Sequence, residues 1–307
     1  MNGIWQQIEA QLRETLNQTL HFTQRQTVTG GCINETWRIT AKHHAQSQHY
    51  FVKLQPSAQH HNNPFAVEFY GLQALAETQT LRVPQALAYG QAEGTAFLVM
   101  EYLNLSGRTQ AKKAGEQLAA LHHHYASDFG WTMNNLIGNS VQINTPCPDW
   151  LSFWRKHRLG VQLDLAQQNG IHSSIYQAGQ TLSMQLDQFF DQREIKPSLL
   201  HGDLWAGNLA YTPSGEVVVY DPAVYYGDHE ADLAMTTLFG GFSSDFYEAY
   251  HHHYPLAQGY EVRKDLYNLY HILNHYNLFG GGYDQQAKRM IQRLLAELNE
   301  GLYYPYD

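Results

Sequence analysis

The stretch that decides the fold is LLHGDLWAGN at positions 199–208, followed by the apolar run VVVY at 217–220 and then Asp221. Each apolar run ends in a polar loop, and the two loops carry Asp203, Asn208 and Asp221. Burying such groups together costs free energy unless each finds partners. In phosphoryl transfer from ATP, one carboxylate takes the proton of the attacking hydroxyl, while an Asn and a second carboxylate hold Mg²⁺ on the phosphates. The pattern therefore predicts Asp203 as the base and Asn208 and Asp221 as Mg²⁺ ligands; the alternative is a polar turn before a strand.

Composition excludes several other classes of protein. The 307 residues are 43% apolar, as in a globular chain, and the net charge of −9 argues against a nucleic-acid surface. No apolar stretch is long enough to span a bilayer, and the polar segment 1–20 does not resemble a signal peptide. With only Cys32 and Cys147, a disulfide-stapled secreted domain is not expected. We therefore expect a cytoplasmic protein with no nucleic-acid or membrane partner.

The chain carries 18 histidines, including runs at 122–124 and 251–253. Adjacent residues on a helix point in different directions, so a run does not make a set of metal ligands. No cysteine lies nearby at zinc-binding spacing. We interpret both runs as solvated helix faces.

Periodicity predicts an α+β fold with two lobes. Strand-like runs lie in 27–39 (strand, glycine turn, strand), 50–54 and 97–100, with helices over 4–16 and 64–77. Further helical patterns follow at 111–125, 150–168, 174–190, 231–238, 245–253, 262–278 and 285–299. We predict a bilobal protein-kinase-like fold in which a small N-terminal sheet lobe with one main helix, residues 1–103, binds nucleotide. A larger, mostly helical lobe, residues 104–307, would carry catalysis and substrate binding, and the two would form one catalytic unit.

Several residues of the first lobe are candidates for binding ATP. Gly30, Gly31, Cys32 and Asn34 form a turn between strands, which brings backbone N–H groups close to phosphates or simply closes a hairpin. Lys53 lies among apolar neighbours and either points outward or reaches the phosphates, held by an ion pair with Glu68. The strand end at the lobe junction is expected to meet the adenine edge through Met100, Glu101, Tyr102 and Leu103.

Residues around the proposed base are candidates for binding or supporting the substrate. Trp205 lies between the base and Asn208, where an indole face could stack on a sugar ring or pack in the core. Asp228, Glu230 and Asp232 begin a predicted helix, where carboxylates favour the helix dipole. We expect Asp228 and Glu230 to bind substrate, and Asp232 to brace the catalytic loop together with His201.

These motifs resemble the protein-kinase-like superfamily, in its small-molecule branch with aminoglycoside and choline kinases. His-Gly-Asp at 201–203 stands where protein kinases have His-Arg-Asp, and Asp-Pro-Ala at 221–223 where they have Asp-Phe-Gly. Within this branch the chain is most similar to the fructosamine kinase family, including bacterial ketosamine-3-kinase-like members. The matches cover nearly the whole chain, and they include 30–34, 129–131, 135, 137–138, 142, 144, 150, 153, 201–208, 221–228, 230, 232–234 and 279–281.

The resemblance implies ATP-dependent phosphorylation, with Mg²⁺, of the 3-hydroxyl of a ketosamine such as a ribulosamine, erythrulosamine or fructosamine. The 3-phosphate would shed the sugar and restore the amine, so the implied partners are glycated amines or glycated proteins. Family members can form a disulfide between subunits through a cysteine in the glycine loop, here Cys32. The resemblance thus implies a monomer or a Cys32-linked homodimer, with Cys32 as a redox switch; an inert strand residue is the alternative.

Two other functions stay open on the sequence alone. One is a kinase of another amine or sugar, of the aminoglycoside or choline type. The other is a non-catalytic nucleotide-binding redox sensor. The presence of Lys53, Asp203, Asn208 and Asp221 argues against the second, because a protein without catalysis need not keep all four.

Overall fold

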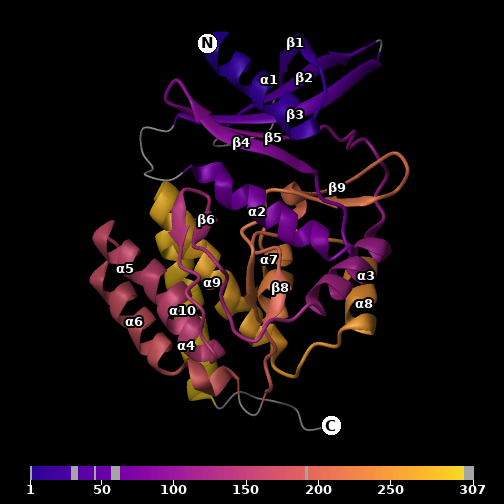
Figure 1. The fold of residues 1–307 in the computed structure, drawn as a ribbon. Coiled ribbons are helices and arrows are strands. Elements are labelled where there is room, and N and C mark those ends of the chain that lie inside the picture. Colours follow the sequence, from indigo (N-terminus) through magenta and orange to yellow (C-terminus); the bar gives the residue numbers. More distant parts are fainter. Residues whose placement is uncertain (1, 29–33, 45, 57–62, 191–192, 301–307) are drawn as a thin grey trace. The chain divides into compact units, whose positions relative to one another are not determined.

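The computed structural model describes residues 2–28, 34–44, 46–56, 63–190 and 193–300. The chain divides into two units (Figure 1): the first is Met1–Gln110 with Ala210–Pro222, and the second is Ala111–Leu209 with Ala223–Asp307. The first unit is an antiparallel sheet with helices and the second is mostly helical, so the predicted fold class is confirmed. The predicted ranges differ from these units, because 210–222 joins the first unit although it lies far along the chain.

The first unit contains a five-stranded sheet in the order β1-β2-β3-β5-β4. Its strands are β1 (His21–Thr27), β2 (Glu35–His43), β3 (Gln46–Pro56), β4 (Ala86–Ala92) and β5 (Thr95–Glu101), with helices α1 (Asn2–Leu16) and α2 (Pro64–Glu77). The apolar residues of α1 recur at helical spacing and form one buried core with the sheet. Lys53 lies on the central strand β3, opposite Thr36 of β2 and Leu98 of β5. Flanking strands on both sides hold this lysine at a defined place.

A short hairpin of β9 (Leu209–Tyr211) and β10 (Val217–Val219) completes the first unit. Arg82 holds it through two backbone hydrogen bonds, from Arg82 N to Val217 O at 3.2 Å and from Val219 N to Arg82 O at 2.9 Å. Gly107 N donates to Tyr211 O at 2.8 Å. These long-range bonds, which no local pattern encodes, explain why 210–222 belongs with the first unit.

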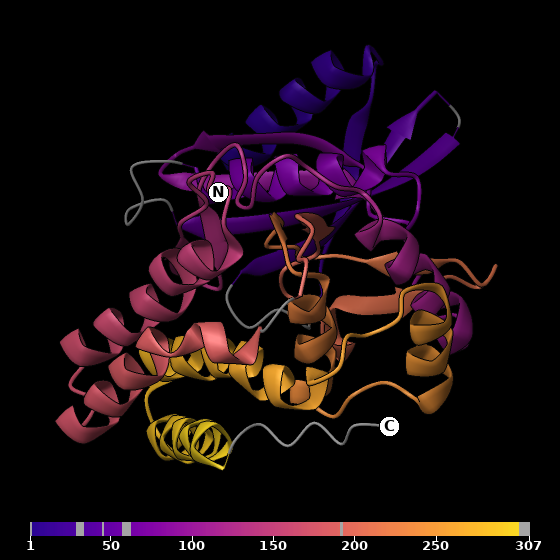
Figure 2. The same ribbon diagram turned by 90° about the horizontal axis from the view of Figure 1, so that it is seen from below.

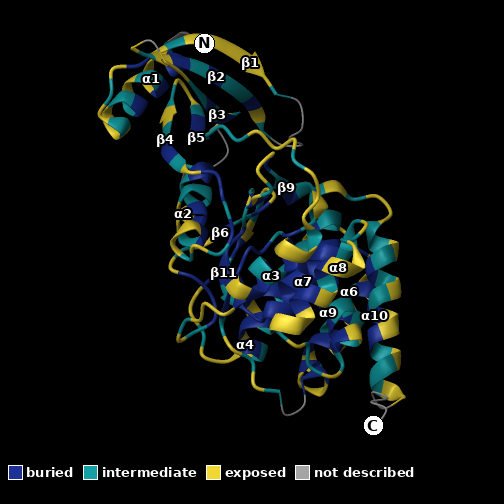
Figure 3. Ribbon diagram, turned by 90° about the vertical axis from the view of Figure 1, so that its right-hand side faces the viewer, coloured by how far each residue is buried: buried dark blue, intermediate teal, exposed yellow. Residues whose placement is uncertain are grey.

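The second unit is built around α9 (Tyr260–Phe279), which is buried over most of its middle (Figure 3). The other helices are α3 (Ala111–His122), α4 (Trp150–Trp154), α5 (Gly160–Gln168), α6 (Ser173–Met184), α7 (His229–Leu238), α8 (Ser244–His253) and α10 (Tyr283–Asn299). The yellow helix α10 runs beside α9 in Figure 2, and α7 packs on α9 as well. A π-helical turn at Arg155–Leu159 joins α4 to α5, and a 3₁₀ turn at Leu186–Phe189 follows α6.

Short strands and one further 3₁₀ turn carry the loops of this unit. They are β6 (Asn135–Ile137), β7 (Ser140–Gln142), β8 (Ser198–Leu200), β11 (Tyr225–Gly227) and the turn Ala206–Asn208. Strand β8 pairs antiparallel with β11, and Leu200 lies opposite Tyr225. Within the described residues, no helix is both long enough and apolar enough to cross a membrane.

Candidate active site

The expected ATP-binding and catalytic residues fall into two groups, one in each unit. In the first unit, Lys53 Nζ donates to Glu68 Oε1 at 2.6 Å and also to Asp221 Oδ1. The Lys53 side chain is buried, so a cation held between two carboxylates is far more stable there than a lone one. The structure therefore brings together three residues that the sequence separates by up to 168 positions.

The pKa values in this cluster follow from burial and from charge. Burial alone would lower the pKa of Lys53, but Asp221 and Glu68 outweigh it and raise the pKa above its usual value. Burial raises the pKa of Glu68, and Lys53 acts in the opposite direction. Lys53 therefore stays charged over the whole physiological range, as a phosphate ligand must.

Asp221 has an unusual backbone conformation. Its φ of 57° places a non-glycine residue in the left-handed region, which costs free energy unless the surroundings enforce it. Its side chain is 48% exposed, whereas that of Lys53 is only 7% exposed. One carboxylate oxygen binds Lys53 while much of the group faces solvent, so Asp221 could also bind a cation.

Two further candidates for ATP binding, Glu101 and Tyr102, lie at the end of β5. Glu101 directs its carboxylate to Arg82 Nη2 and to the backbone of Gln85, both at 2.7 Å. The N–H groups of Glu101 and Tyr102 donate to the carbonyls of Gln85 and His49, so neither donor is available to an adenine ring in this structure.

Of the other candidates for ATP binding, the structure describes Met100, Leu103 and Asn34. Met100 is buried within β5, and Leu103 follows the strand end, half-buried. Asn34 has a buried Oδ1 without a hydrogen-bond partner among the described residues. Gly30, Gly31 and Cys32 lie outside the described residues.

In the second unit, the catalytic loop begins where β8 ends. Gly202 has a φ of 83°, and a Cβ there would lie 2.0 Å from the carbonyl oxygen of Ala223, so only glycine fits. Asn208 Nδ2 donates to the Asp203 carbonyl at 2.8 Å and lies 3.3 Å from Asp203 Oδ2. Asp203 N donates to His201 Nδ1 at 3.3 Å. The loop thus holds the proposed base and the proposed amide ligand against each other.

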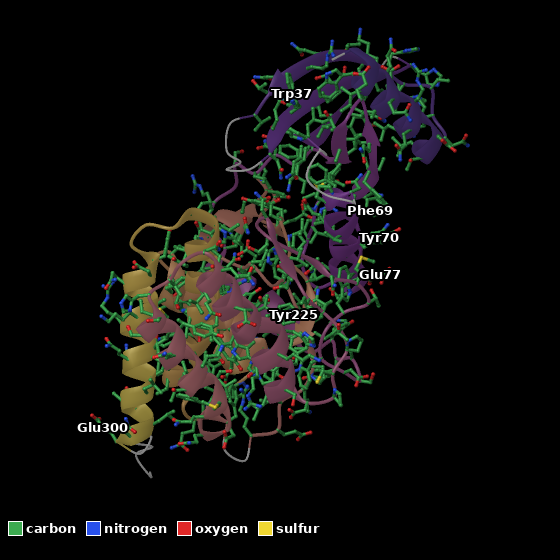
Figure 4. The ribbon with its side chains drawn as sticks, turned by 90° about the vertical axis from the view of Figure 1, so that its left-hand side faces the viewer. Trp37, Phe69, Tyr70, Glu77, Tyr225 and Glu300 are labelled. Atoms are coloured by element: carbon green, nitrogen blue, oxygen red, sulfur yellow. The ribbon has the colours of Figure 1, made fainter. Side chains whose placement is uncertain are left out.

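Asp232 supports this loop from outside it, and Tyr225 pairs with the strand that precedes it. Asp232, on α7, accepts from His201 N at 2.6 Å and from Gly202 N at 2.8 Å. Tyr225, labelled in Figure 4, lies opposite Leu200 at the end of β8 and stacks on Arg158, whose guanidinium carbon is 4.0 Å from the ring centroid. Burial would raise the pKa of Asp232, but His122 outweighs it, so the carboxylate is ionised. Its two acceptor oxygens match two loop N–H groups.

The expectation that Asp228 and Glu230 bind substrate does not agree with their positions. Both are fully buried. Asp228 accepts from Arg193 Nη2 at 2.8 Å and from the Tyr267 hydroxyl, and it caps α7 by accepting from Glu230 N at 3.1 Å. Glu230 binds Arg263 through Nε at 2.7 Å and Nη2 at 3.0 Å. Two paired, buried carboxylates present no face to a substrate, so the structure assigns them to the scaffold.

The pKa values of this pair agree with a structural role. Burial by itself would raise the pKa of Asp228, but Arg193 outweighs it and lowers the pKa to about 2. Burial raises the pKa of Glu230, which Arg263 counteracts. The arginine partners lie more than 30 residues away along the chain, which is why sequence reasoning missed them.

Trp205 begins a row of partly exposed aromatic rings. Its ring centroid lies 5.7 Å from that of Phe239, which lies 5.1 Å from that of His275. From His275 the row continues to Phe279 at 5.7 Å and Tyr283 at 5.2 Å. Phe279 is 61% exposed. Trp205 is half-buried, so both expectations for it, stacking and packing, fit part of this geometry.

The residues that could hold a metal are few. Among the described residues, no group of three or more His, Cys, Asp or Glu could enclose an ion. Mg²⁺ is commonly held by one or two protein oxygens together with substrate phosphates and water, so a sparse set is sufficient. Asn208 turns its amide nitrogen toward Asp203, and Asp221 is half-exposed. Their oxygen chemistry fits a hard cation.

The prediction for the histidine runs is wrong at one position. His123, His124 and 251–253 are exposed, as expected, but His122 is fully buried. Its Nδ1 lies 2.7 Å from the Tyr250 hydroxyl and its Nε2 lies 3.2 Å from Asp232 Oδ2. On α3, His122 lies at helical spacing from the buried apolar residues Leu118 and Leu121. That spacing is the sequence signal that distinguishes His122 from His123 and His124.

Comparison with known proteins gives one consistent result. The family model described as fructosamine kinase matches residues 4–297. A probable ketoamine kinase of Synechocystis is 43% identical over 95% of this chain and 97% of its own length. A chloroplastic protein-ribulosamine 3-kinase of Arabidopsis thaliana is 40% identical over 92% of this chain and 86% of its own. The crystal structure of a fructosamine-3-kinase candidate from Haemophilus somnus superposes with a TM-score of 0.85, at 28% identity, over 96% of this chain and 98% of that one.

Proposed function

The chain belongs to the fructosamine kinase family and is an ATP-dependent phosphotransferase, and on this premise we propose that it phosphorylates the 3-hydroxyl of a ketosamine. The observation that carries the proposal is the loop 201–208, in which Asn208 Nδ2 donates to the Asp203 carbonyl and the half-buried Trp205 lies between these two residues in the sequence. The similarity to a protein-ribulosamine 3-kinase favours a ribulosamine over a fructosamine. Elimination of inorganic phosphate from C3, followed by hydrolysis of the resulting imine, would then free the amine, which amounts to deglycation.

Each proposed role follows from the chemistry of the residue. The Asp203 carboxylate orients the 3-hydroxyl and accepts its proton as the new bond from that oxygen to the γ-phosphorus forms. The bond from the γ-phosphorus to the departing ADP oxygen breaks in the same transfer. Lys53, fixed by Glu68, supplies a positive charge to the phosphates. Met100 to Leu103 would meet the adenine through carbonyl groups and apolar side chains, because two N–H donors are already used.

Mg²⁺ is proposed as the metal, with Asn208 and Asp221 as its protein ligands. A bound Mg²⁺ supplies positive charge that neutralises phosphate oxygens during transfer. Asp221 contributes a carboxylate, one oxygen of which binds Lys53, and Asn208 contributes an amide oxygen. Both are oxygen ligands of the kind that Mg²⁺ prefers.

The aromatic row fits the remaining parts of a ketosamine. The indole of Trp205 offers a face that would stack on the C–H surface of a sugar, and the rings of Phe239 and His275 follow it, inclined by 72° and 51° to their neighbours. A cationic amine is attracted to such faces as well. Trp205 therefore stays the proposed sugar contact, whereas Asp228 and Glu230 do not.

The proposal is tested by ATP turnover against a panel of ribulosamine, erythrulosamine, fructosamine, aminoglycoside and choline, with the phosphorylated product identified. We expect a ribulosamine to give the highest kcat/KM. Asp203→Asn should lower kcat roughly a hundredfold or more without abolishing ATP binding. Asp245→Asn, an exposed carboxylate on α8, is the control and should match the wild type. Higher kcat/KM for choline or an aminoglycoside, or wild-type turnover by Asp203→Asn, would reject the proposal.

We propose, from the composition of the chain, that the reaction takes place in the cytoplasm. Two cysteines and a net charge of −9 are consistent with a cytoplasmic protein that acts on glycated amines or glycated proteins and not on nucleic acid.

A further inference from the structure

A tyrosine hydroxyl lies between two buried histidines in the second unit. Tyr250 Oη is 2.7 Å from His122 Nδ1 and 2.8 Å from His229 Nδ1. All three residues are buried, on α8, α3 and α7 respectively. A hydroxyl has one hydrogen to donate, so it must donate to one of these nitrogens and accept from the other.

The outer partners of the two histidines determine the direction of the hydrogen bonds in this group. At one end, His122 Nε2 lies 3.2 Å from Asp232 Oδ2, and an ionised carboxylate can only accept, so Nε2 carries the hydrogen. At the other end, Arg193 Nη2 lies 3.2 Å from His229 Nε2. A guanidinium can only donate, so His229 Nε2 is unprotonated and accepts.

Only one arrangement then satisfies every contact with neutral histidines. Arg193 donates to His229 Nε2, His229 Nδ1–H donates to Tyr250 Oη, Tyr250 donates to His122 Nδ1, and His122 Nε2–H donates to Asp232. Asp232 is the residue that accepts the backbone N–H groups of His201 and Gly202, directly before Asp203.

We propose that His229, Tyr250 and His122 form a one-way hydrogen-bond relay whose purpose is to hold Asp232, and through it the loop that carries Asp203, in its working position. These are positioning residues, since none of them lies on the loop itself. The relay also fixes the two histidines as opposite tautomers: His229 protonated on Nδ1 and His122 on Nε2.

The surroundings of His229 support a neutral ring in this relay. Burial lowers the pKa of His229 to about 3, and Arg193 and Arg263 reinforce that effect while Asp228 opposes it. His229 also stacks on Tyr254 with ring centroids 3.9 Å apart, which fixes the ring plane. Hydrogen bonds within a buried network strengthen one another, so the loss of a central hydrogen bond weakens those that remain on either side of it.

The first test does not depend on activity. Nitrogen NMR of ¹⁵N-histidine-labelled protein distinguishes protonated from bare ring nitrogens. We expect His122 as the Nε2–H tautomer and His229 as the Nδ1–H tautomer, with assignments made by His122→Gln and His229→Gln. The reverse pair, or a charged His229 at pH 7, would overturn the relay.

The second test is kinetic and rests on the proposed function, since it uses turnover of a ketosamine. Tyr250→Phe removes the central hydroxyl and should lower kcat roughly tenfold while KM for ATP changes less than about twofold. Tyr260→Phe is the matched control, because its buried hydroxyl has no hydrogen-bond partner among the described residues, and it should leave kcat unchanged.

A conservative replacement separates positioning from packing. His122→Gln keeps an N–H donor for Asp232 and should retain more kcat than His122→Leu, which has none, at equal melting temperature. Equal kcat in these two variants, or wild-type kcat in Tyr250→Phe, would overturn the relay. If the wild type phosphorylates no ketosamine, the proposed function fails, whereas the tautomer assignment is still decided by NMR.

Discussion

Single buried histidines make the stability of this protein dependent on pH. Burial lowers the pKa of both His229 and His271 to about 3, whereas the pKa of a histidine in the unfolded chain is about 6.5. At pH values between about 3 and about 6.5, these two histidines bind protons in the unfolded chain but not in the native protein. The free energy of unfolding therefore rises with pH in this window and falls as pH drops below about 6.5.

We predict that His271→Gln reduces this acid sensitivity. Each buried neutral histidine contributes a slope of about 1.4 kcal/mol per pH unit below pH 6. Urea unfolding at pH 7.5, 6.0 and 5.0 should show a shallower slope for His271→Gln than for the wild type. The exposed His251→Gln is the control and should keep the wild-type slope. An unchanged slope in His271→Gln would contradict the burial argument.

At the scale of elements, α3 and α8 pack with their backbones unusually close. A Cβ on Gly115 would lie 2.1 Å from the backbone oxygen of Phe246, so the helices meet only because Gly115 has no side chain. These two helices carry His122 and Tyr250, whose 2.7 Å contact depends on the same spacing.

We predict that Gly115→Ala forces the two helices apart. Inserting a methyl group into a packed contact costs about 1 to 3 kcal/mol, and the loss should appear in urea unfolding together with reduced kcat. Gly282→Ala is a suitable comparison, because a Cβ there would meet nothing within 4 Å and the variant should unfold like the wild type. Equal unfolding free energies for the two variants would show that α3 and α8 adjust at no cost.

Some elements could be predicted from the sequence and others could not. The long helices of the second unit were predicted because apolar residues recur at their spacing. Strand β4 was missed, because Ala86–Ala92 is rich in alanine and glycine, which strands disfavour, and only its pairing with β5 makes it a strand. The scaffold role of Asp228 and Glu230 was missed for a similar reason, since the arginines that neutralise them are remote in sequence. Local pattern identifies an element, but long-range partners decide the role of a buried charge.

At the scale of the whole molecule, the expected Cys32-linked dimer concerns a residue that lies outside the described residues. We predict that mild oxidation produces a disulfide-linked dimer on non-reducing gels, because a thiol flanked by backbone N–H groups favours the reactive thiolate. Cys32→Ser should abolish that dimer. Cys147→Ser, which removes the other cysteine, should retain it. A dimer that persists in Cys32→Ser, or that disappears in Cys147→Ser, would reject the pairing.

The hairpin at 210–222 determines when the first unit can be finished during synthesis on the ribosome. Residues 1–110 emerge early, but the unit also needs the strand that pairs with Arg82 and the carboxylate of Asp221 that binds Lys53. Until residue 222 has left the exit tunnel, the nascent chain must carry Lys53 with only one of its two carboxylate partners. A truncated transcript ending near residue 110 would therefore yield an incomplete domain, and separate expression of the two halves would require the hairpin to be supplied with the first.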